Sequence, residues 1–361
     1  MAFTLEMFPH IYKSKFNGQT WDETFVEKEH KSYEEEKAME ESEKEALLLG
    51  RNNFSDLPLV NYTTQYGMGC FEGLKAFPQK NGGIKLFRPD ENVKRMKKSM
   101  EGLMMPPVEE DRLLQGILKM VKLNADSGFA IPYDAAWEKD DYLSGHALYV
   151  RPFSYAEPGI GVNLSYFPWV IVVATPVGSY FEVGGTNDAV TTDMVRATKN
   201  GTGWIKCDSN YVIPTLAKKK AIADGFMEAI FLDAEEHRYI EEGSSCNFFC
   251  LMKDGTLVTP ELGDTILPGI TRKSILQLAQ DRGIKTEERK LSVEEVFADG
   301  AECFVSGTAA GLTPINSLTH LGQKKVFSES GTGKVSEALL VELKGIQYGA
   351  IEDRYDWMWS V

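Results

Sequence analysis

The chain has 361 residues, with 39 Lys or Arg against 53 Asp or Glu, and a formal net charge of −14. Proteins that bind nucleic acids or dock on anionic membranes need clustered positive charge, so this balance argues against both classes. No run of about 18 apolar residues is present, and Met1–Phe16 lacks the pattern of a signal peptide, so we expect neither a membrane span nor a targeting segment.

Cysteine and histidine are sparse, with five residues of each type. Cys246 and Cys250 have no second Cys or His pair near them, which argues against a zinc site, and the scattered histidines indicate no hydrolase triad. An odd, sparse set of cysteines is typical of reduced thiols in a cytoplasmic protein. We therefore expect no metal site and a cytoplasmic location.

Predicted elements of the first half begin after a charged N-terminal stretch. Residues 27–46 are rich in charges and helix formers, which predicts a solvated helix or extension. Pro89 followed by two acidic residues predicts the start of a helix, whose apolar positions from Val93 to Leu103 fall at helical spacing. Strands are predicted at Leu59–Thr63, Ile84–Phe87, 147–153 and 169–175.

The amino-acid composition changes after the last of these strands. Residues 177–188 are rich in glycine and poor in core residues, which favours a linker between two domains. Beyond it, strand and helix signals alternate. Helices are predicted at Tyr211–Asp224, Pro268–Arg282 and 334–346, strands at Ala229–Asp233 and Cys303–Ser306, and a hairpin at Phe248–Met252 and Leu257–Thr259.

The most informative stretch for chemistry is 196–216, where Lys206 stands among the apolar residues Trp204, Ile205 and Cys207. Most lysines are charged residues on the protein surface, and without further evidence Lys206 would be interpreted in the same way. Burial, however, favours the neutral amine of a lysine, which can act as a nucleophile or a base.

The segment resembles the Schiff-base lysine region of fold type IV pyridoxal-phosphate (PLP) enzymes, specifically the branched-chain aminotransferases, whose K-x-x-x-N-Y pattern falls here on Lys206, Asn210 and Tyr211. The resemblance covers roughly residues 57–345. Its further matches, in order, are Phe71–Phe77, Leu86–Pro89, Leu148–Pro152, Glu242–Asn247, Leu267–Gly269 and Ser306–Ala309.

The resemblance implies an α/β (α+β) fold of two domains: a small α+β domain over 1–176 with a charged extension, the linker at 177–188, and a large PLP-binding domain over 189–361. Lys206 would hold PLP covalently and then act as the general base. Glu242 would keep the pyridine nitrogen protonated, and Tyr211 would bind the phenolic oxygen. The residues implied for the phosphate are Arg88, Ile270, Thr271 and Thr308.

Substrate residues are carried over in the same way. Tyr66 and Phe71 would line an apolar pocket that suits leucine, isoleucine and valine, while Tyr149 and Arg151 lie at the substrate side and could receive the γ-carboxylate of glutamate. The backbone of Thr308 and Ala309 would bind the α-carboxylate. The sequence departs from the animal enzymes of the family, because Gly307–Leu312 contains no Cys-x-x-Cys pair, and Cys207 beside the lysine is expected to be a packed thiol.

We therefore expect a PLP-dependent transaminase that exchanges amino groups between branched-chain L-amino acids and 2-oxoglutarate, as part of branched-chain amino acid biosynthesis or degradation. D-amino-acid aminotransferase and aminodeoxychorismate lyase share the fold and remain alternatives, and a non-catalytic binding protein is disfavoured by the intact residue set. The family also implies a homodimer or a dimer-based oligomer.

Overall fold

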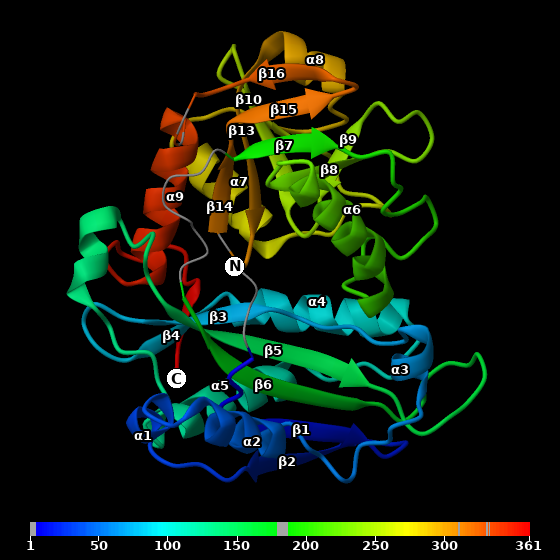
Figure 1. Cartoon of the computed structure of the whole chain (residues 1–361), viewed down its shortest axis with the longest axis vertical. Coiled ribbons are helices and arrows are strands. Elements are labelled where there is room, and N and C mark those ends of the chain that lie inside the picture. Colours follow the sequence, from blue (N-terminus) through cyan, green and yellow to red (C-terminus); the bar gives the residue numbers. More distant parts are fainter. Residues whose placement is uncertain (1–4, 179–186, 310, 330, 332) are drawn as a thin grey trace. The chain divides into compact units, whose positions relative to one another are not determined.

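The computed structural model describes residues 5–178, 187–309, 311–329, 331 and 333–361 (Figure 1). The chain divides into two compact units, each with a sheet of its own. Unit 1 contains Met1–Ser179, Lys206–Ser209 and Ile346–Val361, and unit 2 contains Tyr180–Ile205 and Asn210–Gly345. Of the linker expected at 177–188, residues 179–186 lie outside the described residues. The predicted domain boundaries stay a prediction.

Unit 1 is built on a seven-stranded antiparallel sheet with the order β17-β4-β3-β5-β6-β1-β2. The long apolar strands β5 and β6 form its centre. The strands are β1 (His10–Phe16), β2 (Trp21–Glu27), β3 (Leu74–Pro78), β4 (Ile84–Phe87), β5 (Ala147–Tyr155), β6 (Trp169–Val177) and β17 (Met358–Ser360). The predicted strands at 84–87, 147–153 and 169–175 are thereby confirmed.

The helices of unit 1 are α1 (Tyr33–Lys37), α2 (Glu41–Arg51), α3 (Tyr62–Tyr66), α4 (Pro89–Gly102), α5 (Glu110–Asp126) and a 3₁₀ helix at Ala135–Asp140. Helix α5 packs against β1, β6 and α4. Helix α4 begins at Pro89 as predicted and buries Val93, Met96 and Met100. Burial of these apolar side chains fixes the helix, and with it the side chains of α4 that contact Glu72 and Lys206.

The strand predicted at Leu59–Thr63 is wrong. The chain there forms a turn and then α3, which starts after Asn61 because the Asn61 side chain accepts a hydrogen bond from the Thr64 backbone N–H. Leu59 is 86% exposed, so the apolar residues that favoured a strand are not part of a sheet. A helix cap thus outweighs a short apolar run.

The charged segment 27–46 is partly helical, as expected, and forms α1 and most of α2 with largely exposed side chains. One pair departs from this pattern. Glu36 and Arg51 are buried and form an ion pair, and Arg51 also donates to the backbone carbonyl groups of Met7 and Glu29. This pair fixes the two helices to the beginning of the chain.

Unit 2 is built on a mixed ten-stranded sheet in which eight strands follow the order β12-β11-β10-β9-β8-β7-β15-β16, while β13 pairs with β10 and β14. The pairs β11/β12, β7/β8 and β7/β15 are parallel. The strands are β7 (Asp188–Thr191), β8 (Glu228–Leu232), β9 (Ile240–Gly243), β10 (Asn247–Met252), β11 (Leu257–Thr259), β12 (Thr286–Glu288), β13 (Gly300–Gly307), β14 (Gly311–Ile315), β15 (Ser317–His320) and β16 (Gln323–Val326).

Helix α6 packs against β8, α7 against β13 and β12, and α8 against β10 and β13 (Figure 1). The core contains Phe248, Val258 and Val305, each at most 4% exposed. The helices are α6 (Val212–Ala223), after a 3₁₀ turn at Asp208–Tyr211, then α7 (Ile270–Asp281), α8 (Val293–Asp299) and α9 (Lys334–Gln347). The predicted helices, strands and hairpin of this half are confirmed within a few residues at their ends.

None of the helices in the described part of the chain has both the length and the apolar character needed to cross a membrane.

Candidate active site

The backbone of Lys206 is held against the sheet of unit 1. Its N–H donates to Ser99 Oγ of α4 at 3.0 Å, and its carbonyl oxygen accepts from the Phe71 N–H at 3.1 Å. One bridge position further on, Cys207 lies opposite Cys70, and the Asp208 N–H donates to the Gly69 carbonyl at 2.9 Å. Two hydrogen bonds of Lys206 and one of Asp208 therefore fix the irregular segment that carries the lysine.

The side chain of Lys206 joins a cluster of three predicted substrate residues. Its Nζ lies 4.8 Å from the centre of the Phe71 ring, and the Arg151 guanidinium carbon lies 4.6 Å from the same ring. Arg151 donates to Tyr149 Oη at 3.0 Å. The aromatic rings thus hold two cations next to an apolar surface, since the face of a ring attracts positive charge.

Two close contacts set the position of this cluster. Gly73 lies directly beneath Tyr149, and a Cβ at Gly73 would collide with Tyr149 Oη. Glu72, which is fully buried, accepts hydrogen bonds from Arg95 Nε at 2.7 Å and Nη2 at 2.8 Å. This bidentate ion pair ties α4 to the residue that follows Phe71.

Asp208 and Tyr66 lie at the edge of the same region. Burial raises the pKa of the Asp208 carboxyl to about 6, and the nearby charge of Arg151 opposes the rise. Tyr66 ends α3 with 41% of its surface exposed, and no described ring contact or hydrogen bond joins it to Phe71. The structure therefore brings Lys206, Phe71, Tyr149 and Arg151 together and leaves Tyr66 outside this set of contacts.

Arg88 stands between β4 and α4, in a left-handed backbone conformation with φ 48° and ψ 46°. This conformation is strained for a residue with a side chain. The guanidinium lies 5.0 Å from the Trp357 ring centre and is 3.9 Å from Glu91. Burial lowers its pKa, which the charges of Glu91 and Asp90 oppose. The turn thus holds a buried arginine at the start of a helix.

In unit 2, Glu242 is a buried carboxylate with two partners. Arg196 Nη2 lies 2.7 Å from its Oε1, and Asn247 Nδ2 donates to its Oε2 at 3.0 Å. The neighbouring Glu241 has no described partner at Oε2, and burial raises its pKa to about 7. Of the two adjacent carboxylates, Glu242 is the one held by an arginine.

Strand register places Glu242 in a row with other polar residues. Asn247 pairs with Glu242 of β9 on one side and with Ser306 of β13 on the other. Residues paired across strands point to the same face of a sheet. Ser306 Oγ is buried without a hydrogen-bond partner among the described residues, and Thr308 and Ala309 lie just beyond it. The row of paired residues therefore runs from Glu242 to Ser306, which directly precedes Gly307 and Thr308.

Asn247 also connects Glu242 to the N-terminus of α7. Its Nδ2 donates to the carbonyl oxygen of Leu267 at 2.9 Å, and a Cβ at Gly269 would collide with its Oδ1. Gly269 is the N-cap of α7 and, in the described part of the chain, no side chain caps this helix. The first N–H groups, those of Ile270 and Thr271, therefore have no partner within the helix. Such N–H groups favour an anion.

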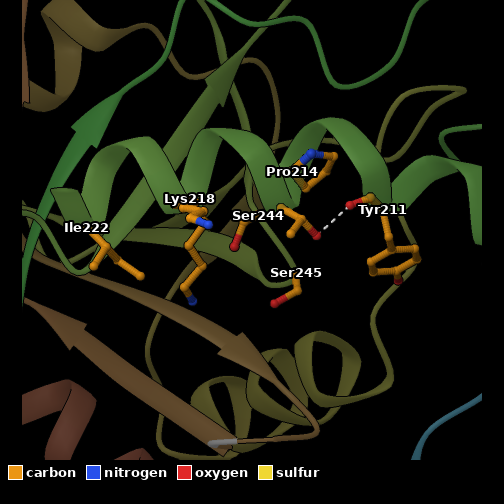
Figure 2. A pocket seen from close by; sticks show the side chains of 8 residues that line it. Tyr211, Pro214, Lys218, Ile222, Ser244 and Ser245 are labelled. Atoms are coloured by element: carbon orange, nitrogen blue, oxygen red, sulfur yellow. Dashed lines mark hydrogen bonds between the residues drawn. The ribbon is translucent and has the colours of Figure 1, made fainter. Parts of the chain in front are cut away.

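Tyr211 stands at the start of α6, where its carbonyl oxygen accepts a hydrogen bond from Thr215 Oγ1 at 2.7 Å. Figure 2 shows it at one end of a pocket of about 330 Å³, with Ser244 and Ser245, which follow Glu242, along the wall. Lys218 also lines this pocket and pairs with Glu228 at 3.0 Å. Ser244 Oγ is buried and has no hydrogen-bond partner among the residues that the structure describes.

Sequence reasoning missed Arg196, Ser99 and Arg95. Arg196 is the first residue of the stretch 196–216, which also contains Lys206. Nothing in its sequence position indicates that it pairs with Glu242, far along the chain. Ser99 and Arg95 read as polar positions of an amphipathic helix. All three act through partners that only the folded chain brings close.

Comparison with known proteins now adds to this geometry. Residues 69–318 match the family described as Amino-transferase class IV. A probable branched-chain-amino-acid aminotransferase of Staphylococcus epidermidis is 38% identical over 301 residues, which cover 81% of this chain and 80% of that protein.

Solved structures of branched-chain aminotransferases are similar to this chain as well. The branched-chain amino acid aminotransferase from Escherichia coli has a TM-score of 0.72 and 26% identity, and the alignment covers 97% of this chain and 98% of that chain. The branched-chain aminotransferase from the archaeon Thermoproteus uzoniensis, solved with norvaline, has a TM-score of 0.71 and 27% identity, covering 85% and 94%. The resemblance seen in the sequence and the expected fold are confirmed. The chain therefore belongs to the class IV aminotransferases, within the branched-chain-amino-acid aminotransferases, and is a transaminase.

Proposed function

We propose that this chain transfers the amino group reversibly between L-leucine, L-isoleucine or L-valine and 2-oxoglutarate, with PLP as its cofactor. The observation that carries the proposal is the fixed position of Lys206, whose backbone makes hydrogen bonds to Ser99 of α4 and to Phe71. A reacting amine must return to the same place in each half-reaction, which such anchoring favours.

The donor groups fit PLP. The cofactor needs an amine for its aldehyde carbon, a carboxylate for its ring nitrogen and N–H groups with a cation for its phosphate. Lys206 offers the amine, and Glu242, held by Arg196 and Asn247, offers the carboxylate. The uncapped start of α7 and the buried Ser306 Oγ, which lacks a partner among the described residues, are further polar groups with capacity for a ligand.

When bound, PLP supplies an electron-withdrawing ring that stabilises negative charge at the substrate Cα. Lys206 Nζ would hold the cofactor and, with the substrate bound, would move the proton between the substrate Cα and the cofactor C4′. Glu242 keeps a proton on the pyridine nitrogen, with its charge balanced by Arg196. Tyr211 donates to the phenolic oxygen. The groups that bind the phosphate are Arg88, the N–H groups of Ile270 and Thr271, and Thr308.

The substrate side chain would lie against Phe71, with Tyr66 and Tyr149 at the pocket's edge. Lys206 and Arg151 both lie near the Phe71 ring. An apolar substrate side chain packed on this ring would therefore lie next to the reacting amine. Arg151 and Tyr149 would receive the γ-carboxylate of glutamate, which explains how one pocket accepts both substrates. The backbone of Thr308 and Ala309 would bind the α-carboxylate.

We further propose a homodimer in the cytoplasm. Helix α6 supports association of two copies, because it buries Pro214, Ala217 and Ala221 while Val212, Leu216 and Ile222 are between 51% and 60% exposed. Apolar side chains gathered on one side of a helix are typical of an interface. A second copy of the chain would cover them.

Enzyme kinetics test the proposal against the other activities of the fold. Holoenzyme is assayed with L-leucine and 2-oxoglutarate, with D-alanine, and with aminodeoxychorismate. We expect turnover of L-leucine only, and its loss in Lys206→Ala but not in Lys199→Ala, because Lys199 is an exposed lysine of the same stretch. Turnover of D-alanine or aminodeoxychorismate without that of L-leucine would contradict the proposed substrate.

A further inference from the structure

Two histidines that the sequence separates come together beside the first hairpin. The β1/β2 register places His10 directly opposite Glu27, and His30 follows three residues after Glu27. One ligand atom from each of the three side chains lies within 4.8 Å of the other two. Glu27 and His30 lie at the start of the charged segment 27–46.

The two ring nitrogens of His30 each lie close to an oxygen atom. His30 Nδ1 lies 3.0 Å from the carbonyl oxygen of Lys31, so this nitrogen carries a hydrogen. His30 Nε2 lies 3.1 Å from Glu27 Oε1. A ring nitrogen and a carboxylate oxygen this close together could both be ligands of one metal cation.

The ring of His10 is fixed through one of its two nitrogens. Ring atom Nε2 is hydrogen-bonded to Ser127 Oγ at 2.8 Å, and the backbone of His10 exchanges hydrogen bonds with the Asn124 side chain of α5. A metal-binding histidine is typically fixed through its second ring nitrogen in this way.

We propose that His10, Glu27 and His30 form a binding site for a divalent transition-metal ion of the zinc class. Two imidazoles and a carboxylate are a donor set that Zn²⁺, Co²⁺ and Ni²⁺ accept. Ligands about 2.0–2.1 Å from a tetrahedral ion lie about 3.3 Å apart. The His30–Glu27 separation is close to this value, and Glu27, with 64% of its side chain exposed, has room to adjust.

The site goes beyond the transaminase reaction and differs from the expectation that the chain has no metal site. A bound ion would link β1 to the end of β2 and to the segment that enters α1. With three protein ligands, the fourth position would hold water. The ion would stabilise the N-terminal part of unit 1 and take no part in amino transfer.

The test uses tag-free holoenzyme, stripped of metal with a chelator and then titrated with ZnCl₂ by calorimetry, with Co²⁺ absorbance as a second probe. We expect one saturable site per chain and a higher thermal midpoint with Zn²⁺. Glu27→Gln and His30→Gln should each weaken binding at least about 10-fold. The matched controls Glu29→Gln and His237→Asn, both at exposed positions outside the cluster, should bind as the parent does.

Transaminase activity, measured in the same samples, should be equal in all five proteins, which separates this proposal from the function itself. A failure to bind Zn²⁺ or Co²⁺ saturably would overturn it and would leave the His30–Glu27 contact as a hydrogen bond between two side chains. Binding that survives both Glu27→Gln and His30→Gln would overturn it as well, because the ion would then lie elsewhere. Because both side chains are partly or largely exposed, these variants should fold.

Discussion

The guanidinium of Arg196 lies 2.7 Å from Glu242 Oε1, and both side chains are at most 5% exposed. Arg196→Met would leave a buried carboxylate without its cation, which costs about 3–5 kcal/mol if the charge is kept. The carboxyl would instead take up a proton and could no longer hold one on the pyridine nitrogen. We predict a lower thermal midpoint and a kcat at least about 10-fold below the parent value.

Arg238→Met is the matched control for this prediction. Arg238 also pairs with a glutamate, Glu294, at 3.3 Å, but the two side chains are 50% and 66% exposed. An exposed pair contributes about 0–1 kcal/mol. The control should leave both the thermal midpoint and kcat unchanged, and equal effects of the two substitutions would contradict the role assigned to Arg196.

A second prediction concerns Gly269, where a Cβ would collide with Asn247 Oδ1. Gly269→Ala should displace the amide that connects Glu242 to the start of α7, destabilise the fold by about 1–3 kcal/mol and weaken cofactor retention. Dialysis followed by the visible spectrum measures the retained cofactor. Gly263→Ala is the control, because no described atom lies within 4 Å of its added Cβ. Full cofactor retention in Gly269→Ala would argue against this connection.

The hydrogen bond from the Lys206 N–H to Ser99 Oγ gives a third prediction. Ser99→Ala removes the acceptor and loosens the segment that carries the lysine, at a stability cost of about 1 kcal/mol. Misplacement of a reacting group lowers kcat more than it changes KM, and we expect a fall of about 10-fold or more. Ser99→Thr keeps a hydroxyl and should restore most of kcat. If Ser99→Thr behaves as Ser99→Ala, the hydroxyl is not what positions Lys206.

Much of the fold follows from local signals in the sequence. Pro89 and Pro268 mark helix starts, and the apolar runs of β6 and β8 indicate buried strands, because these signals depend only on neighbours along the chain. The failure at Leu59–Thr63 has the same origin. A short apolar run cannot report that its side chains stay exposed or that Asn61 caps a helix.

The candidate site is less accessible to sequence reasoning, since its geometry depends on pairings over long separations. Lys206 and Glu242 could be named through the family resemblance. Arg196 could not, because its partner is set by the folded sheet and not by spacing. Likewise, His10 and His30 look scattered until the hairpin register brings His10 opposite Glu27, next to His30. The sequence carries the chemistry of these side chains, and the strand pairing supplies their proximity.

A fourth prediction is the pH dependence of stability. Burial raises the pKa of Glu241 from 4.5 to about 7; a hydrogen bond with Thr265 opposes this rise, and the charge of Glu242 adds to it. The folded state thus prefers the protonated carboxyl, which adds to the free energy of unfolding. This stabilisation is fully present below about pH 4.5 and is lost as the pH rises through about 7, and it amounts to up to about 3 kcal/mol.

Glu241→Gln removes this titration and keeps a neutral side chain of the same size. We expect the thermal midpoint of the parent protein to fall relative to that of Glu241→Gln across this pH window. Thermal denaturation of both proteins in matched buffers measures the difference. Parallel profiles of the two proteins would show that the Glu241 carboxyl does not titrate in this range.

Lys206 is the lysine that we assign to the cofactor. Borohydride reduction of the holoenzyme fixes the cofactor to its lysine, and peptide mapping by mass spectrometry then locates it. We predict that the label lies on Lys206 and that Lys206→Ala carries none, while Lys199→Ala is labelled as the parent is. A label on any other lysine would contradict the assignment of the active site.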